Sequence, residues 1–208
     1  MTAAQLIVLR HGRTAWNASG RFQGQADIEL DERGLAQADR AAAVLAELAP
    51  TAIFSSDLSR ARQTAAPLAS RCGLEVQTDR RLREIHVGSW EGLTYDQVLG
   101  ELDDDLRRAY LAGEDVRRSP TGETVAEVAD RAAAALDEIG LDADDGSTVV
   151  VVMHGTAARV ALCRLLGFPT ETWKRLSGLD NCGWVSLERH RTGDYWRITQ
   201  YNATAPRR

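Results

Sequence analysis

Lysine is nearly absent from this chain of 208 residues. Its 25 basic side chains include a single lysine, Lys174, so the other 24 are arginines (25 − 1 = 24). This balance, in an alanine-rich chain, is typical of GC-rich coding, and most of the arginines therefore need no functional explanation. The 30 acidic residues give a net charge of −5, which argues against a nucleic-acid partner because such binding needs a net basic face. Net charge does not exclude a small basic pocket.

Long hydrophobic runs and paired cysteines are also lacking. The purely apolar run at residues 149–153, like every other such run in the chain, is far shorter than the roughly 20 residues that a membrane span requires. The N-terminal residues do not show the pattern of a secretory signal. The three cysteines, Cys72, Cys163 and Cys182, are odd in number and lack metal-ligand spacing. We therefore expect free thiols, a cytoplasmic location and no membrane partner.

What is present is a globular composition with alternating strand and helix patterns. With 44% hydrophobic and 26% charged residues, the chain is predicted to form a single domain over residues 1–208. Strands are expected near residues 5–9, 52–54, 74–76, 148–153, 183–188 and 196–201. Helices are expected near residues 31–48, 57–71, 122–139 and 156–166, with Ser56 or Asp57 capping the second, and one or two short polar helices are expected within residues 94–111.

This alternation predicts an α/β fold, a three-layer sandwich whose mostly parallel sheet carries helices on both faces. Residues 12–30 form a long polar loop, residues 80–93 are irregular, and residues 94–122 form a small helical insert that is a candidate lid. Two histidines, His11 and His154, each follow the end of a predicted strand. Ligands bind at this edge of open α/β sheets, so the two side chains could face one another across one crevice.

The stretch LRHGRTAWN, from Leu9 to Asn17, carries groups suited to phosphoryl transfer. A neutral imidazole can attack phosphorus, and the guanidinium of the adjacent Arg10 matches phosphate oxygens in pairs. Gly12 permits close approach of the chain to a ligand. On its own, however, Arg-His-Gly fits an ordinary loop histidine better than a catalytic one.

The longer pattern resembles the histidine phosphatase superfamily, which contains phosphoglycerate mutases and many phosphatases. LRHGRTAWN is similar to the family signature, and FQGQAD (22–27) to the loop that follows it. SSDLSRA (55–61) resembles the second arginine motif, LREIHVG (82–88) the segment with the family's acid, and VVMHG (151–155) the second histidine motif. The motifs occur in family order and span most of the chain.

The resemblance implies a role for each matching residue. His11 would accept the phosphoryl group, while Arg10, Arg60 and His154 would bind the phosphate oxygens as charge develops. Glu84 would protonate the leaving oxygen and then activate water, and a bound phosphate dianion would favour its protonated form. Three further residues would bind the substrate: Asn17, Gln23 and Gly155, the last at a helix start whose free backbone N–H groups suit an anion. No metal or cofactor is expected.

Three functions remain open at this stage. A metal-independent phosphomonoesterase with a phosphohistidine intermediate is favoured, because cofactor-dependent phosphoglycerate mutases, the second alternative, are typically longer with an extended basic insert. A non-catalytic binder of a phosphorylated ligand is disfavoured, since both histidines, both arginines and Glu84 are all present. The substrate is expected to be a small phosphorylated metabolite. SSDLSRA, LREIHVGSWEGLT and LIVLRHG most resemble actinobacterial glucosyl-3-phosphoglycerate phosphatases, which makes glucosyl-3-phosphoglycerate one candidate. Family members are often homodimers, so the resemblance suggests one here.

The sequence leaves the roles of one segment and one histidine undecided. GLDNCGW (178–184) is similar to a family loop near the pocket but departs from it at Cys182 and Gly183, so contact of Asn181 and Cys182 with the site is undecided. His86 follows Glu84 by two residues and fits a supporting role behind the site as well as a simple surface role.

Overall fold

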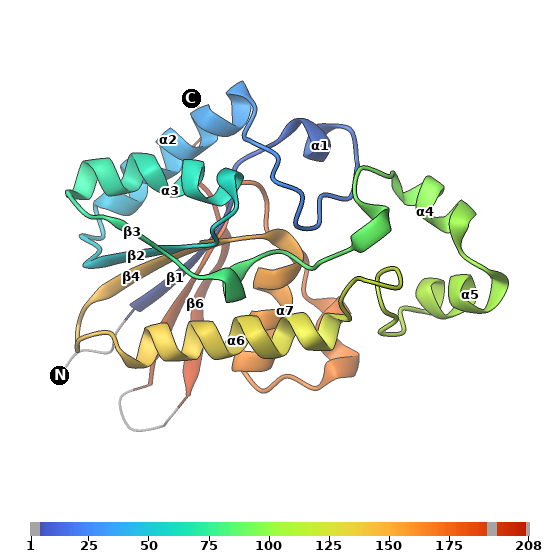
Figure 1. Cartoon of the computed structure of the whole chain (residues 1–208). Helices are drawn as coiled ribbons and strands as arrows, with labels where there is room; N and C mark the ends of the chain where they lie inside the picture. Colours follow the sequence, from blue (N-terminus) through green and yellow to red (C-terminus); the bar gives the residue numbers. More distant parts are fainter. Residues whose placement is uncertain (1–4, 191–194, 207–208) are drawn as a thin grey trace.

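One six-stranded sheet forms the centre of the molecule in the computed structural model, which describes residues 5–190 and 195–206 (Figure 1). The strands lie in the order β3-β2-β4-β1-β5-β6. Their bounds are Gln5–Arg10 for β1, Ala52–Ser55 for β2, Val76–Thr78 for β3, Thr148–Met153 for β4, Trp184–Arg189 for β5 and Trp196–Ala203 for β6.

The four strands β3, β2, β4 and β1 run parallel, while β5 pairs antiparallel with β1 and β6 antiparallel with β5. The sheet is therefore mixed. The two strands that lead to the predicted histidines, β1 and β4, belong to its parallel part. Every residue of β4 is buried, as expected for a β-branched strand covered on both faces.

Helices cover both faces of the sheet and complete the predicted three-layer sandwich (Figure 1). Helices α2 (Glu32–Ala46) and α3 (Ser59–Cys72) pack on one face around Ile7, Leu9 and Ile53. Helices α6 (Val125–Leu141) and α7 (Gly155–Leu165) pack on the other around Leu6, Val8 and Val151. The α/β fold class predicted from the sequence is confirmed.

The buried faces of α6 and α7, two helices that pack against one another, are rich in small side chains. Buried alanines lie on both helices: Ala129, Ala132, Ala133 and Ala135 on α6, and Ala157, Ala158 and Ala161 on α7. Short side chains let two helix backbones approach closely and leave few gaps to fill. This layer positions the first turn of α7, which lies at the end of β4.

Several element boundaries differ from the sequence predictions. The loop 12–30 contains a one-turn helix, α1 (Ala15–Ala18), and the irregular segment 80–93 contains two 3₁₀ turns, η1 (Arg80–Leu82) and η2 (Gly88–Trp90). Of the one or two short helices expected within residues 94–111, the structure has two, α4 (Tyr95–Glu101) and α5 (Asp104–Ala112), because Asp103 caps a new helix there. A further 3₁₀ helix, η3, spans Thr170–Arg175.

The predicted cap of α3 is wrong. The N-cap position is Leu58, whose side chain makes no cap hydrogen bond. The carboxylate of Asp27 caps the helix from the preceding loop, because its Oδ1 accepts from the Ser59 N–H at 2.6 Å. Asp57 instead binds Arg83 through two hydrogen bonds of 2.6 Å.

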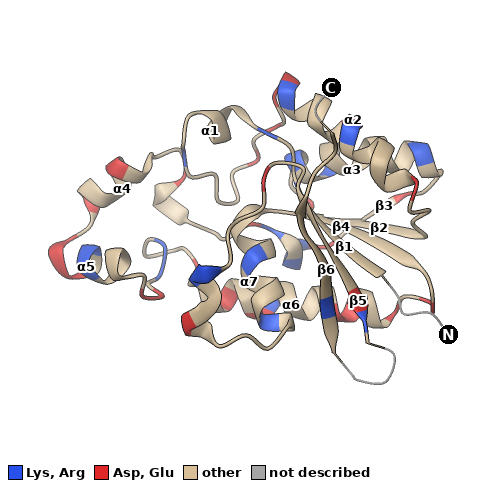
Figure 2. Cartoon of the chain, turned by 180° about the vertical axis from the view of Figure 1, so that it is seen from behind, with Lys and Arg blue, Asp and Glu red and all other residues tan. Residues whose placement is uncertain are grey.

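Charge is mixed over the outside of this frame. Figure 2 shows acidic and basic residues interspersed along the helices, while the central strands carry few of either. Among the described residues, no helix is long and apolar enough to cross a membrane.

Candidate active site

The ends of β1 and β4 bring the two predicted histidines together. Arg10 pairs with Met153 in the parallel register, so the residues that follow, His11 and His154, leave neighbouring strands side by side. The His11 N–H donates to the Met153 carbonyl at 3.0 Å, and the two imidazole ring centres lie 5.1 Å apart. Residues 143 positions apart thus form one site, as the sequence predicts.

His11 is held as a neutral imidazole in a single tautomer. Its Nδ1 lies 2.7 Å from the Gly12 carbonyl oxygen, which can only accept, so Nδ1 carries the proton and Nε2 keeps its lone pair. Burial, and then the nearby guanidinium groups of Arg60 and Arg10, hold the pKa of His11 well below its usual value. Nε2 is therefore free to act as a nucleophile at neutral pH.

The loop carrying His11 is packed tightly against α2 and α3. The Gly12 N–H donates to Thr64 Oγ1 at 3.0 Å. A Cβ atom on Gly12 would lie 2.6 Å from the Gly34 carbonyl oxygen, so glycine is required at this position by the backbone of α2. Close approach of the chain was expected at Gly12, and the group that approaches is this neighbouring helix.

Arg60 and His154 form a second buried pair opposite His11. Arg60, fully buried near the start of α3, donates from Nε to His154 Nδ1 at 3.2 Å. Its terminal nitrogens donate to the carbonyls of Ala26 and Gly24 at 2.7 and 2.8 Å. Burial first, and then Arg60 and His11, lower the pKa of His154 well below its usual value. His154 is therefore neutral, with its proton on Nε2.

Two buried donors at the site have no partner among the described residues. They are His154 Nε2 and Arg10 Nε. Arg10 is otherwise anchored by a hydrogen bond from Nη1 to the Leu179 carbonyl, and its guanidinium lies against Gly155 at the start of α7. Buried donors without partners are costly, so these two N–H groups are suited to a ligand that accepts hydrogen bonds.

Glu84 reaches the same helix start from the segment that follows η1. Its Oε1 accepts from the N–H groups of Ile85 and Ala157 at 2.9 Å each, and its Oε2 from the Thr156 N–H at 3.1 Å. The sequence prediction left the first N–H groups of α7 free for a phosphate. The structure corrects this prediction, because the carboxylate of Glu84 occupies those of Thr156 and Ala157.

Thr14 holds the two predicted substrate-binding amides, Asn17 and Gln23. Its hydroxyl lies 3.2 Å from Asn17 Oδ1 and 3.0 Å from Gln23 Oε1, and the Thr14 backbone N–H also donates to Asn17 Oδ1. Both amide oxygens are thus occupied, which leaves the NH₂ groups to bind an acceptor. Sequence reasoning missed Thr14, although a threonine three residues before Asn17 is the spacing of a helix cap.

The loop 178–184 lies against His11, which settles a contact that the sequence left undecided. The Cys182 N–H donates to the carbonyls of Arg10 and His11 at 3.1 and 3.3 Å. The Asn181 side chain donates to the His11 carbonyl at 3.1 Å and to Asn17 Oδ1 at 3.2 Å. Both residues therefore support the loop that carries His11, and Cys182 does so with a left-handed φ of 57°.

Behind Glu84 lies a support that sequence reasoning missed. Arg131 of α6 donates to the carbonyls of Arg81, Arg83 and Glu84 at 2.7, 2.8 and 3.0 Å, and it pairs with Glu123 at 2.8 Å. One arginine among the many of this chain carries no pattern that distinguishes it in a single sequence. His86, by contrast, is half-buried and bonds through Nδ1 to the Thr121 carbonyl at 2.9 Å, which ties this segment to the insert.

These residues define a class of site. A neutral buried histidine with a free Nε2 lies among two arginines, a second histidine with an open donor, and a carboxylate. Such groups suit transfer of a phosphoryl group, which depends on positioning and on stabilising anionic oxygens. Among the described residues, no cluster of three or more His, Cys, Asp or Glu side chains could hold a metal ion.

The chain belongs to the histidine phosphatase superfamily (branch 1), whose family model matches residues 6–204, and it is a phosphatase of that family. It is 40% identical to a glucosyl-3-phosphoglycerate phosphatase of Mycolicibacterium vanbaalenii over 99% of this chain and 97% of that protein. It is also 40% identical to a probable phosphoglycerate mutase of Yersinia pestis, over 86% of this chain and 81% of the relative. A solved mycobacterial glucosyl-3-phosphoglycerate phosphatase in complex with VO3 superimposes with a TM-score of 0.84 at 40% identity, covering 96% of this chain and 99% of that one.

Proposed function

We propose that the chain is a metal-independent phosphomonoesterase that forms a phosphohistidine on His11 Nε2. The observation that carries the proposal is the state of His11, which is neutral and fixed through Nδ1 beside two unpartnered donors, Arg10 Nε and His154 Nε2. Guanidinium and imidazole groups, instead of a metal, would bind the phosphate oxygens.

In the first step, His11 Nε2 attacks phosphorus and the bond from phosphorus to the ester oxygen breaks. Arg10, Arg60 and His154 bind the three phosphoryl oxygens as charge develops on them. Protonated Glu84 gives its proton to the departing oxygen, so that the product leaves as an alcohol. Asn17 and Gln23 donate hydrogen bonds from their amide groups near the transferred phosphoryl group.

In the second step, water attacks the phosphohistidine. Glu84, now a carboxylate, takes the proton from the attacking water, the bond between phosphorus and Nε2 breaks, and inorganic phosphate is released. His11 returns to its neutral form with the Nδ1 proton still held by the Gly12 carbonyl.

Trapping the intermediate tests the mechanism. After brief incubation with a labelled phosphoester and acid-free quenching, we expect label on His11 that is stable to base and lost in acid. His11→Ala should carry no label and should lose activity by at least a thousandfold. The activity of the wild-type enzyme should survive strong chelation. An active His11→Ala enzyme, or chelator-sensitive activity restored by a divalent ion, would contradict the proposal.

For the substrate, we propose a small phosphorylated metabolite, with glucosyl-3-phosphoglycerate as the first candidate. The relatives of that name support it, since they match this chain over nearly its full length. The match to a probable phosphoglycerate mutase supports isomerisation as the second candidate. A panel of phosphorylated metabolites, assayed with and without bisphosphoglycerate for free phosphate and for isomerised product, separates the two. Neither product from any substrate would indicate a binding protein.

We further propose that residues 1–208 act as one domain and that the insert 94–122 is its lid. Helices α4 and α5 of the insert project from the body in Figure 1, and of the residues in these two helices Val98 alone is buried. A cavity of about 570 Å³ lies between the insert and α7, lined by side chains that include Tyr110, Arg118 and Arg159. We also propose that the protein is cytoplasmic, because its three unpaired cysteines are consistent with a reducing compartment. The proposal of a homodimer rests on the family resemblance alone.

A further inference from the structure

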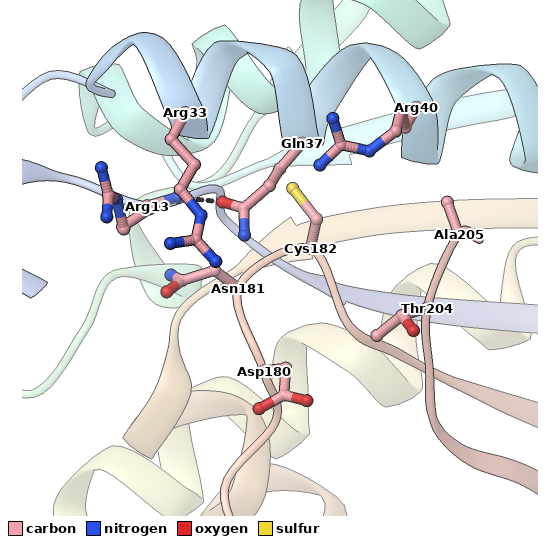
Figure 3. Close-up of a pocket in the computed structure, with 9 residues that line it drawn as sticks. All are labelled: Arg13, Arg33, Gln37, Arg40, Asp180, Asn181, Cys182, Thr204 and Ala205. Atoms are coloured by element: carbon pink, nitrogen blue, oxygen red, sulfur yellow. Dashed lines mark hydrogen bonds between the residues drawn. The ribbon is translucent and has the colours of Figure 1, made fainter. Parts of the chain in front are cut away.

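A second basic pocket lies outside the catalytic site, between α2, the loop 180–182 and the end of the chain (Figure 3). Its volume is about 290 Å³, which is near the lower limit for pockets that bind small molecules. None of His11, Arg60, Glu84 or His154 lines it. Nine residues do: Arg13, Arg33, Gln37, Arg40, Asp180, Asn181, Cys182, Thr204 and Ala205.

Helix α2 supplies one polar face of this pocket. Arg33, Gln37 and Arg40 are spaced by four and three residues, so they lie on the same side of the helix. Figure 3 shows all three side chains directed toward the loop that contains Asn181 and Cys182. The Gln37 Oε1 accepts from the Arg13 backbone N–H at 2.9 Å, which leaves the Gln37 NH₂ group as a further donor.

Most of the positive charge of the pocket is not neutralised within the protein. Arg13 pairs with Asp31 at 2.8 Å. Over residues 5–190 and 195–206, however, Arg33 and Arg40 make neither an ion pair nor a side-chain hydrogen bond. Asp180 is the one acidic residue in the lining, and its charge also acts on the catalytic Arg10. Burial raises the pKa of the Cys182 thiol to about 12. This thiol, which lies near Arg40, is therefore neutral and does not offset the charge of the arginine.

A tightly packed backbone separates the pocket from the catalytic site. A Cβ atom on Gly34 would lie 2.0 Å from the Arg13 carbonyl oxygen, so the start of α2 packs directly on the chain that follows His11. Asn181 lies on the boundary: it lines the pocket, and its side chain donates to the His11 carbonyl. The two sites are therefore distinct but share one wall.

We propose that this pocket is a second binding site for a small anion that carries a phosphoryl group, held by Arg33 and Arg40 with Gln37 between them. Two guanidinium groups and an amide on one helix face can donate to several oxygens of one tetrahedral anion. The small volume favours a compact ligand. This inference concerns binding alone and does not depend on the reaction proposed above.

Nuclear magnetic resonance titration with inorganic phosphate tests the site, because it locates binding even when the affinity is low. In the wild-type protein, we expect saturable shifts of the Gln37 side-chain amide and of the Arg33 and Arg40 Nε–H signals. In the double variant Arg33→Gln/Arg40→Gln, the response of Gln37 should be lost or need at least tenfold more phosphate, while the Gly12 and Thr156 amides still report binding at the catalytic site.

The matched control removes two positive charges elsewhere. Arg108→Gln/Arg175→Gln changes exposed arginines of α5 and η3 and should keep the Gln37 response. An Arg10→Gln protein, weakened at the catalytic site, should keep it too. Methylphosphonate, titrated in parallel, determines whether the pocket accepts a phosphoryl group attached to carbon or only the free ion. No response of Gln37 in the wild-type protein, or an unchanged response in Arg33→Gln/Arg40→Gln, would overturn the proposal.

Discussion

Neutral, buried histidines make the stability of this protein depend on pH. The pKa values of His11 and His154 in the folded chain lie well below 6.5, mainly because of burial, whereas unfolding returns them to about that value. The unfolded state therefore binds more protons as the pH falls, and stability that is present above pH 6.5 is lost below it.

From pH 7.5 to pH 5.5, we expect a loss of about 1.4 kcal/mol per histidine, or about 2.7 kcal/mol for both, in the free energy of unfolding. Urea titrations at the two pH values measure it. His11→Asn should lose about half as much over the same range. Equal losses for the variant and the wild-type protein would show that His11 is not neutral in the folded chain.

Glu84 makes a second prediction at the scale of single residues. Glu84→Gln keeps the shape of the side chain but removes the proton donor, so turnover of alkyl phosphates should fall by about 10²–10⁴. Aryl phosphates with strongly acidic leaving groups need no protonation and should be slowed much less. Steady-state rates over a series of leaving groups test this. A uniform loss across the series would argue against Glu84 as the acid.

At this scale, sequence reasoning identified the side chains that the structure brings together at the proposed site, but not their supports. Arg10, His11 and His154 lie at strand ends, a position that local patterns can identify. Thr14 has the local spacing of a helix cap, but its hydrogen bond to Gln23, like the bonds of Arg131 to the Glu84 segment, joins residues that only the fold brings near. The cap of α3 was mispredicted for the same reason, since Asp27 reaches it from 32 residues away.

At the scale of elements, α6 controls the position of the segment that carries Glu84. Arg131→Gln removes donors from three carbonyls of that segment and leaves the Glu123 carboxylate without its partner. We expect a loss of about 2–3 kcal/mol in the free energy of unfolding and a lower kcat with little change in KM. Arg164→Gln is the matched control, because its ion pair with Asp130 also joins α7 to α6 but is exposed, and it should cost under about 1 kcal/mol.

Both measurements are needed to interpret Arg131→Gln. A stability loss with unchanged kcat would mean that Arg131 only holds α6 in place. Equal effects of Arg131→Gln and Arg164→Gln would contradict a specific role for the hydrogen bonds to the Glu84 segment.

At the scale of the whole molecule, stability is unevenly distributed. Strand β4 is buried throughout, whereas α5 has no buried residue and meets the body through contacts such as Tyr110 on Trp90, with ring centres 5.7 Å apart. We expect the amide hydrogens of α4 and α5 to exchange orders of magnitude faster than those of β4 and α6, because local opening exposes little apolar surface. Exchange followed by mass spectrometry measures this.

Adding orthovanadate extends the same experiment to the proposed lid. If the insert 94–122 closes over an occupied site, its exchange should slow when the oxyanion is bound, while that of β4 stays the same. Exchange in α4 and α5 that matches β4 without ligand would contradict the uneven stability, and no change on binding would contradict the lid.

The overall architecture was predictable because it rests on short-range patterns: apolar strands, helical periodicity and their alternation. The antiparallel placement of β5 beside β1 was not, since strand order depends on long-range packing. Nor could the basic pocket of α2 be predicted, because Arg33 and Arg40 are indistinguishable in sequence from the other arginines of the chain.

The alanines between α6 and α7 bear on how this enzyme can evolve. At such a contact, any larger side chain would push the two helices apart, at a typical cost of about 1–3 kcal/mol. Displacing α7 would carry the N–H groups of Thr156 and Ala157 away from the Glu84 carboxylate. Substitutions in this layer are therefore constrained by their effect on the position of Glu84, while the exposed helices of the insert carry no such packing constraint.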